Sequence, residues 1–252
     1  MNFYTNVVML RNEFLVRGYE NGRRVQFREE FFPTLYVKSK KETKWKTLEG
    51  DNVEPIQPGT VRDCRDFYKK YEGVDGFEIY GNDKYLYQYI SEKYPEDEIK
   101  WDIKKIKLVT IDIEVKSEDG FPSPDSCSEE MLTISIQDYA TKNIITWGRK
   151  PYTPTQNNVT YHYYENEIDM LNAFLNWWNQ DPPEVITGWN CRFYDIPYIC
   201  GRISRIMGEK KMRLLSPWNY VSHEELYING RPNNVYTIAG ITTLDFMELY
   251  QK

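Results

Sequence analysis

The stretch Leu-Val-Thr-Ile-Asp-Ile-Glu-Val at residues 108–115 places two carboxylates inside a run of β-branched and apolar residues. Such a run predicts a buried central strand. Asp112 and Glu114 stand two residues apart, so on a strand their side chains point to the same face. Two buried charges repel each other and lose hydration, so a divalent cation or basic partners must compensate them. Mg²⁺ or Mn²⁺ would do so, because both prefer oxygen ligands.

The alternative is that the two carboxylates lie at the end of the strand, in solvent or paired with Lys104, Lys105 or Lys107. Acidic residues on strands are often solvated or bridged in this way. The Asp-x-Glu pattern alone therefore leaves both interpretations open.

Two strands are predicted directly after this stretch, Met131–Gln137 and Asn143–Trp147, and the three together suggest an antiparallel meander. A helix capped by Asn166 follows. Its apolar residues recur at helical spacing: Ile168, Leu171, Leu175 and Trp178. We expect this helix to cover one face of the sheet.

A short strand, Glu184–Thr187, and a helix, Ile196–Met207, are predicted next. Asp195 therefore lies at a helix entrance, just after a strand and a turn. Leu226–Ile241 predicts a hairpin whose loop contains Asn229-Gly230 and Arg231-Pro232, and Leu244–Tyr250 predicts a further helix or strand.

The N-terminal part predicts a small α+β domain that begins with β-structure. A hairpin turn is expected at Asn21-Gly22, between strands at Glu13–Tyr19 and Arg24–Phe27, and helices at Val61–Tyr71 and Asp83–Tyr94. Residues 39–60 are polar. The boundary is expected near residues 97–105, which gives domains at 1–103 and 104–252.

Composition limits the function classes. Hydrophobic residues make up 40% of the chain, enough for a globular core. The net charge of −6 argues against binding nucleic acid by charge alone, so any such contact must be local. The acidic balance is nevertheless compatible with a nuclease, because carboxylates that hold metal ions make such a site acidic and the cations supply the positive charge. Four scattered cysteines and two histidines match no zinc pattern and suggest reduced thiols. The sequence shows neither a leader nor an apolar run long enough to span a membrane. We therefore expect a cytoplasmic protein without a membrane partner, located in the host cytoplasm if the protein is viral.

The segment Gly188-Trp-Asn-Cys-Arg-Phe-Tyr-Asp-Ile-Pro-Tyr198 resembles the second exonuclease motif of family B DNA polymerases, and Asp112-Ile113-Glu114 resembles the first. Tyr194 stands where that family usually has Phe. The resemblance extends to the replicative polymerases of T4-like bacteriophages, in which residues 118–122 also have a counterpart.

The resemblance implies a ribonuclease H-like (DnaQ-type) fold, incomplete at its C-terminus, that performs two-metal 3′–5′ proofreading hydrolysis of mismatched primer ends. Asp112 would then bridge two Mg²⁺ or Mn²⁺ ions, Glu114 would bind the ion that activates water, and Asp195 would complete the coordination. The implied partners are single-stranded DNA 3′ ends, primer-template DNA and the remainder of the polymerase.

Three residues are expected to contact nucleic acid. Asn190 can hydrogen-bond the terminal sugar or phosphate, and its alternative is a turn residue. Phe121 matches an aromatic position that the family places against the separated strand, and its alternative is packing under a loop. Arg231 lies in the predicted hairpin, which matches in position a hairpin that helps to hold primer and template apart in T4-like polymerases. Its alternative is a solvated side chain.

The family's third exonuclease motif and its palm motifs are not found in residues 1–252, and the sequence looks cut at Gln251-Lys252. We therefore expect little or no nuclease activity from this chain alone. Two other roles stay open. One is a fragment that binds RNA or the template strand through its N-terminal domain. The other is a piece of a split polymerase that is completed in trans.

Overall fold

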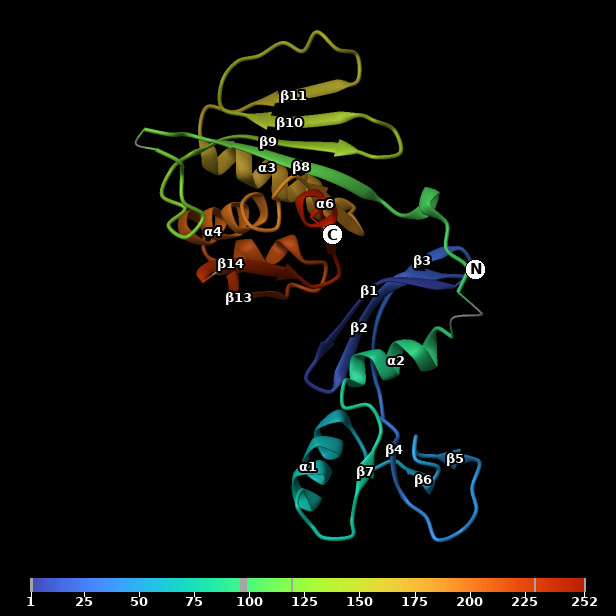
Figure 1. Ribbon diagram of the computed structural model, residues 1–252. Coiled ribbons are helices and arrows are strands. Elements are labelled where there is room, and N and C mark those ends of the chain that lie inside the picture. Colours follow the sequence, from blue (N-terminus) through green and yellow to red (C-terminus); the bar gives the residue numbers. More distant parts are fainter. Residues whose placement is uncertain (1, 96–98, 119, 229, 252) are drawn as a thin grey trace. The chain divides into compact units, whose positions relative to one another are not determined.

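The structure is a computed structural model that describes residues 2–95, 99–118, 120–228 and 230–251, apart from the side chains of Ile228 and Arg231 (Figure 1). It is a mixed α/β protein with several sheets, which agrees with the predicted class in its coarse form. Its contacts divide it into two compact units, Met1–Trp101 and Asp102–Lys252. A functional boundary at residue 103 stays a prediction.

The first unit begins with an antiparallel sheet of β1 (Phe3–Leu10), β2 (Glu13–Glu20) and β3 (Arg23–Glu30). Glu20 pairs with Arg23, and Asn21 and Gly22 between them have φ values of 49° and 75°. Positive φ at both central residues is typical of a type I′ turn, whose twist matches that of the flanking strands. The predicted hairpin is confirmed.

A second sheet of the first unit has the order β5-β6-β4-β7. Its strands are β4 (Leu35–Lys38), β5 (Trp45–Lys46), β6 (Asn52–Ile56) and β7 (Ile79–Tyr80). Two helices accompany them, α1 (Val61–Tyr71) and α2 (Tyr85–Lys93), and both predicted helices are confirmed. Thr60 and Asp63 form a capping box at the start of α1.

The second unit is built on a six-stranded sheet with the order β11-β10-β9-β8-β12-β15. After the short 3-10 helix η1 (Ile103–Lys105), its strands are β8 (Leu108–Val115), β9 (Met131–Asp138), β10 (Ile144–Gly148), β11 (Val159–Tyr163), β12 (Val185–Gly188) and β15 (Thr242–Asp245). The β8-β9-β10 meander is antiparallel, as predicted. By contrast, β12 runs parallel to both β8 and β15. The carboxyl ends of these three strands therefore meet at one end of the sheet.

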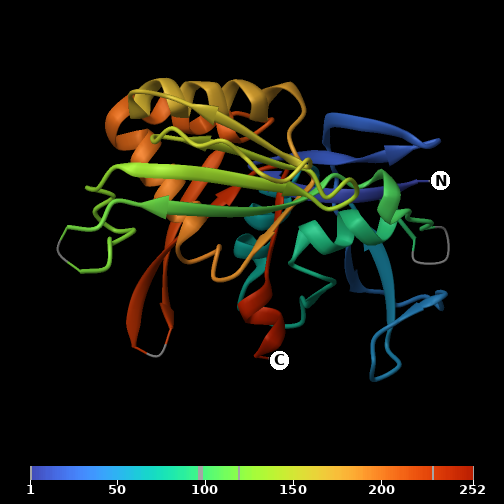
Figure 2. The same cartoon turned by 90° about the horizontal axis from the view of Figure 1, so that it is seen from above.

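Figure 2 shows α3 (Glu167–Gln180) and α4 (Asp195–Met207) on one side of this sheet, followed in the chain by α5 (Glu209–Met212) and the 3-10 helix η2 (Arg213–Leu215). Asn166 caps α3 as predicted, since its side chain accepts from Asp169 N. Ile168, however, is 49% exposed. The buried face instead consists of Glu167, Met170, Leu171, Phe174, Leu175 and Trp178.

The predicted hairpin is present as β13 (Val221–Ile228) paired with β14 (Arg231–Ile238). It begins earlier than predicted, at Val221, while Asn229 in its predicted loop lies outside the described residues. The last predicted element is both a strand and a helix, because α6 (Phe246–Tyr250) follows directly on β15. No helix of the described part is long and apolar enough to span a bilayer. All four cysteines are buried free thiols.

Candidate active site

The central strand β8 has one buried face and one exposed face. Ile111 and Ile113 belong to the core that α3 and α4 cover, whereas Asp112 and Glu114 alternate with them and are exposed. The two carboxylates do share a face, as predicted. The strand was predicted to be buried, and Ile111 and Ile113 are, but Asp112 and Glu114 are exposed, because α3 and α4 lie together on one side of the sheet.

The predicted basic partners do not neutralise this pair. Lys107 instead forms an ion pair with Asp181 at 2.9 Å, and Lys104 and Lys105 lie in η1, before the strand. Within the described residues, neither Asp112 nor Glu114 has a basic partner within ion-pair distance. Neighbouring protein atoms raise the pKa of Asp112 by desolvation. A bound cation would neutralise the two carboxylates on this face.

Asp195 reaches the same strand from α4. It is the first residue of that helix, it is 5% exposed, and its Oδ1 accepts a hydrogen bond of 3.0 Å from the backbone N–H of Ile113. Since Ile113 lies between Asp112 and Glu114, this bond brings the third carboxylate to the other two. Burial first, and then the charge of Asp112, raise the pKa of Asp195 to about 7.

The carboxylates are not arranged as a finished metal centre. Among the described residues, no group of three or more His, Cys, Asp or Glu is placed so that it could hold a metal ion. The chemistry of the donors nevertheless fits Mg²⁺ or Mn²⁺, because all three candidates offer carboxylate oxygens and two of them interact electrostatically.

A pocket of about 490 Å³ lies in the same unit and is lined by two of the predicted nucleic-acid contacts, Phe121 and Asn190. The ring of Phe121 is 78% exposed and packs against the ring of Tyr194 with centroids 4.8 Å apart. Packing under a loop therefore does not describe Phe121. The rest of the wall, which sequence reasoning missed, is Pro124, Phe193, Tyr194, Asn233, Met247, Glu248 and Gln251.

Asn190 is a turn residue, which was the alternative interpretation of this position. Its backbone is left-handed, with φ of 58°, and its carbonyl accepts from the amides of Phe193 and Tyr194, as a turn residue would. Asn190 also lies in the pocket wall. Its contact with a sugar or phosphate stays a prediction.

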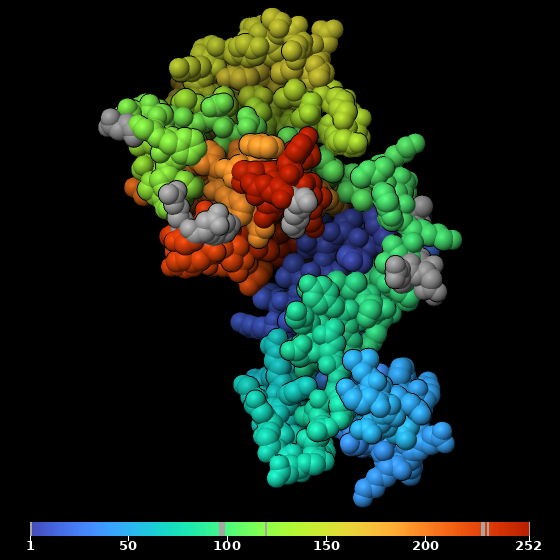
Figure 3. All heavy atoms as spheres, viewed as in Figure 1, coloured from blue at the N-terminus to red at the C-terminus, as the bar shows by residue number. Residues whose placement is uncertain are grey.

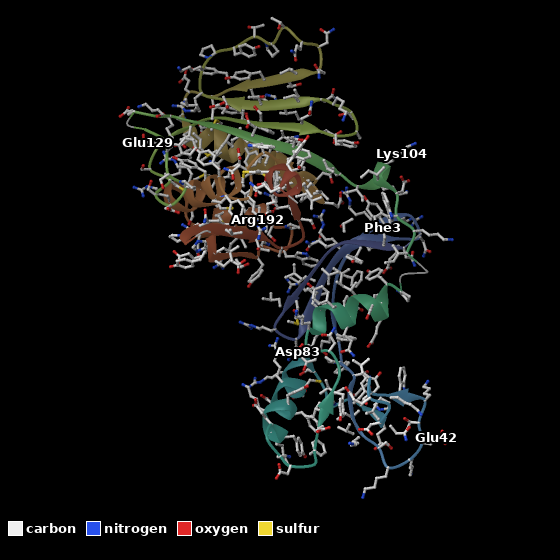
Figure 4. The ribbon with its side chains drawn as sticks, in the orientation of Figure 1. Phe3, Glu42, Asp83, Lys104, Glu129 and Arg192 are labelled. Atoms are coloured by element: carbon white, nitrogen blue, oxygen red, sulfur yellow. The ribbon has the colours of Figure 1, made fainter. Side chains whose placement is uncertain are left out.

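The segment between β8 and β9, which carries Phe121 and the labelled Glu129 of Figure 4, is attached to the helices. Arg202 of α4 donates to the carbonyls of Cys127 and Ser128 and forms a two-pronged ion pair with Glu167 of α3, with bonds of 2.9 and 2.6 Å. Tyr198 bonds both backbone groups of Glu129. Within residues 118–122, Asp119 lies outside the described residues.

The hairpin is attached to the same segment, because Asn234 of β14 donates to Asp125 at 2.5 Å. Arg231 begins β14, but its side chain lies outside the described residues. Its contact with nucleic acid stays a prediction.

Sequence reasoning also missed Asp245, the last residue of β15, which is 1% exposed. Its carboxylate accepts hydrogen bonds of 2.9 Å from the backbone N–H groups of Asn190, Arg192 and Met247. The adjoining helix α6 lies at the surface (Figure 3, red). No local pattern indicates these contacts, since two of the partners lie more than fifty residues earlier.

Carboxylates are the ligands with which proteins hold divalent ions, and such ions can activate water for hydrolysis. The chain belongs to DNA polymerase family B, since the model of that family's exonuclease domain matches residues 80–252.

Among curated proteins, the chain is 29% identical to the DNA-directed DNA polymerase of Enterobacteria phage T4, over 99% of this chain and 30% of that protein. It is 28% identical to the polymerase of Escherichia phage RB69, over 99% and 31%. The DNA polymerase catalytic subunit of Saimiriine herpesvirus 2 (strain 11) is 26% identical over 48% of this chain and 12% of that protein. The chain thus spans about 30% of the length of the phage relatives.

Proposed function

We propose that this chain is the N-terminal and exonuclease portion of a replicative DNA polymerase, with a ribonuclease H-like (DnaQ-type) exonuclease fold that removes mismatched 3′ ends. Asp112, Glu114 and Asp195 are its metal-binding acids. The supporting observation is the hydrogen bond from Ile113 N to Asp195 Oδ1, which joins both motifs at one point of β8. Membership of the family supports DNA as the substrate class.

Bound Mg²⁺ or Mn²⁺ ions would supply positive charge to the phosphodiester and lower the pKa of an attacking water. Asp112 and Glu114 would hold them from β8, and Asp195 from α4. A strand and a helix entrance are rigid supports, as precise catalysis requires. The pocket whose wall includes Tyr194, the residue before Asp195, has a volume within the usual range of small-ligand sites. Phe121 would stack on a base there, and Asn190 would bond the terminal sugar or phosphate.

Removing two acids from β8 should weaken metal binding. The Asp112→Ala/Glu114→Ala variant is expected to bind Mn²⁺ more than about tenfold more weakly than the unaltered chain, because ligand oxygens and their negative charge are lost together. Electron paramagnetic resonance titration of free Mn²⁺ measures the affinity.

Glu224→Ala/Glu225→Ala is the matched control, because it removes the same charge from an exposed acidic pair in β13. This control should bind Mn²⁺ like the unaltered chain. Equal affinity in all three proteins would show that these acids hold no metal.

A second candidate function, binding of single-stranded RNA or template strand by the first unit, is supported by a cleft of about 530 Å³. Tyr36 and Trp45 line it with ring centroids 5.4 Å apart, and the Lys44 ammonium lies 5.0 Å from the Trp45 ring. Aromatic rings beside a cation can stack on unpaired bases of any sequence.

Trp45→Ala is expected to weaken binding of a single-stranded oligonucleotide roughly fivefold to a hundredfold, which is the usual effect of removing a stacking ring. Fluorescence anisotropy with labelled RNA and DNA of the same sequence measures the effect and compares the two sugars. Tyr87→Ala removes an exposed ring of α2 in the same unit and serves as the control. If Trp45→Ala bound as tightly as the control, the cleft would have no part in binding.

A further inference from the structure

The carboxyl end of β15 lies beside the start of the loop that leads to Asp195. Asp245 and Gly188 are partners in the parallel register of β15 and β12. The loop of residues 189–194 leaves β12 directly after Gly188 and enters α4. Asp245 is therefore well placed to act on this loop, although it lies far away in the sequence.

The carboxylate of Asp245 accepts three hydrogen bonds, all of them from backbone amides. Oδ1 accepts from Asn190 and Met247, and Oδ2 accepts from Arg192, each at 2.9 Å. Hydrogen bonds to an ionised acceptor are stronger than neutral ones, and an ionised carboxylate needs such donors where it is buried. An asparagine could not replace it, because its NH₂ group would face an N–H donor.

These bonds continue into the first turn of α4. Asn190 is held in a left-handed conformation that non-glycine residues rarely adopt, and its carbonyl accepts from the amides of Phe193 and Tyr194. The carbonyl of Cys191 accepts from Ile196 N at 2.9 Å. Asp195 is the first residue of that helix, directly after this loop, and its carboxylate accepts from Ile113 N of β8.

A side-chain contact reinforces the same loop. The guanidinium of Arg192, which Figure 4 labels, binds Glu248 of α6 at 2.7 Å. Arg192 is thus held at two points: its backbone N–H binds Asp245, and its side chain binds Glu248, one turn further along the chain.

We propose that Asp245 is a positioning residue of the exonuclease site, one that fixes the backbone of Asn190 and Arg192 and thereby places Asp195 against β8. The inference rests on the proposed function for its metal-binding consequence. Its structural part, the immobilised loop, can be measured without metal.

Two variants test the proposal. Asp245→Asn preserves the size of the side chain but loses an acceptor. Asp245→Ser has a shorter side chain that does not reach the loop, but its hydroxyl can still cap α6. This variant therefore separates loop positioning from helix capping, and it replaces Asp245→Asn in the test if that variant does not fold. The matched control is Glu184→Gln, a change of another carboxylate that is 1% exposed, which accepts from Lys107 N at the opposite end of β12.

Amide hydrogen exchange followed by NMR, without metal, is the first measurement. Protection of the Asn190 and Arg192 amides should fall more than about tenfold in both Asp245 variants, while the Ile134 and Ile136 amides of β9 retain theirs. Mn²⁺ affinity is the second measurement, and it should fall roughly tenfold, the usual effect of removing a group that orients a ligand. Glu184→Gln should change neither quantity.

The outcomes are distinct. Retained protection at residues 190 and 192 would overturn the proposal, and so would an equal loss at Ile134 and Ile136, which would reveal general destabilisation. Lost protection with unchanged Mn²⁺ affinity would overturn the link to Asp195. If the unaltered chain bound no Mn²⁺ through Asp112, the proposed function would fail, and the exchange result would still decide whether Asp245 immobilises the loop.

Discussion

Asp195→Asn is expected to stabilise the metal-free protein at pH 8 and to have almost no effect near pH 4. The pKa of Asp195 rises from an ordinary value of 3.8 to about 7, chiefly because the group is buried. Between these values the unfolded chain releases the proton more readily than the folded one, so the free energy of unfolding falls as pH rises. At pH 8 the ionised, buried Asp195 therefore costs the folded protein a few kcal/mol of stability. Asparagine carries no charge and avoids this cost, and it can still accept from Ile113 N.

Urea unfolding in EDTA at several values between pH 4 and pH 8 measures this effect. Asp66→Asn, a change of an aspartate whose side chain is 63% exposed, provides the comparison and should show no such trend. A lower stability of Asp195→Asn at pH 8 would mean that the charged carboxylate is compensated by groups other than a metal. Saturating Mn²⁺ should reverse the order, because only the aspartate gains from the ion.

Arg202→Met should destabilise the second unit by about 3–5 kcal/mol, the usual result of removing one partner of a buried ion pair. The change leaves the carboxylate of Glu167, whose side chain is 9% exposed, without its guanidinium. It also releases the carbonyls of Cys127 and Ser128, so the segment that carries Phe121 should become mobile. Thermal unfolding and amide exchange of residues 120–130 measure the two effects.

The exposed pair Arg213–Glu209 is a suitable control, since Arg213→Met should change stability by less than about 0.5 kcal/mol. The double variant Arg202→Met/Glu167→Leu should recover part of the loss, because no buried charge is left unpaired. Recovery cannot be complete, since Glu167 also accepts from Met131 N. A loss below about 1 kcal/mol in the single variant would contradict the buried ion pair.

Local sequence patterns predicted most elements of the second unit, because each element carries its own periodicity. The alternation in β8 and the cap of Asn166 are such local signals. Ile168 was misplaced because the helical stripe was drawn through the first turn of α3, whereas Glu167 occupies the inward position there and binds Arg202. A charged residue at an inward position is recognisable only when its partner is known.

Pairings between distant segments could not be predicted in this way. The strand β11 is short and polar in part, and it pairs in parallel with β10 across the connection of residues 149–158. For the site, the motifs identified Asp112, Glu114 and Asp195 as candidates, and their roles stay proposals. Asp245 carried no signal, because its importance lies in three amides that only the folded sheet brings together.

The register of β8 against β9 shifts between Glu114 and Val115, so that Leu132 is an extra residue on β9. Upstream of this bulge, alternate residues of β8 belong either to the core or to the acidic face. With the preceding residues kept in register, the loss or gain of a single codon within 108–111 would turn both acids to the core face. In the divergence of such genes, length changes should therefore accumulate in the turn at 139–143 and be purged from β8, even where substitutions in the strand are accepted.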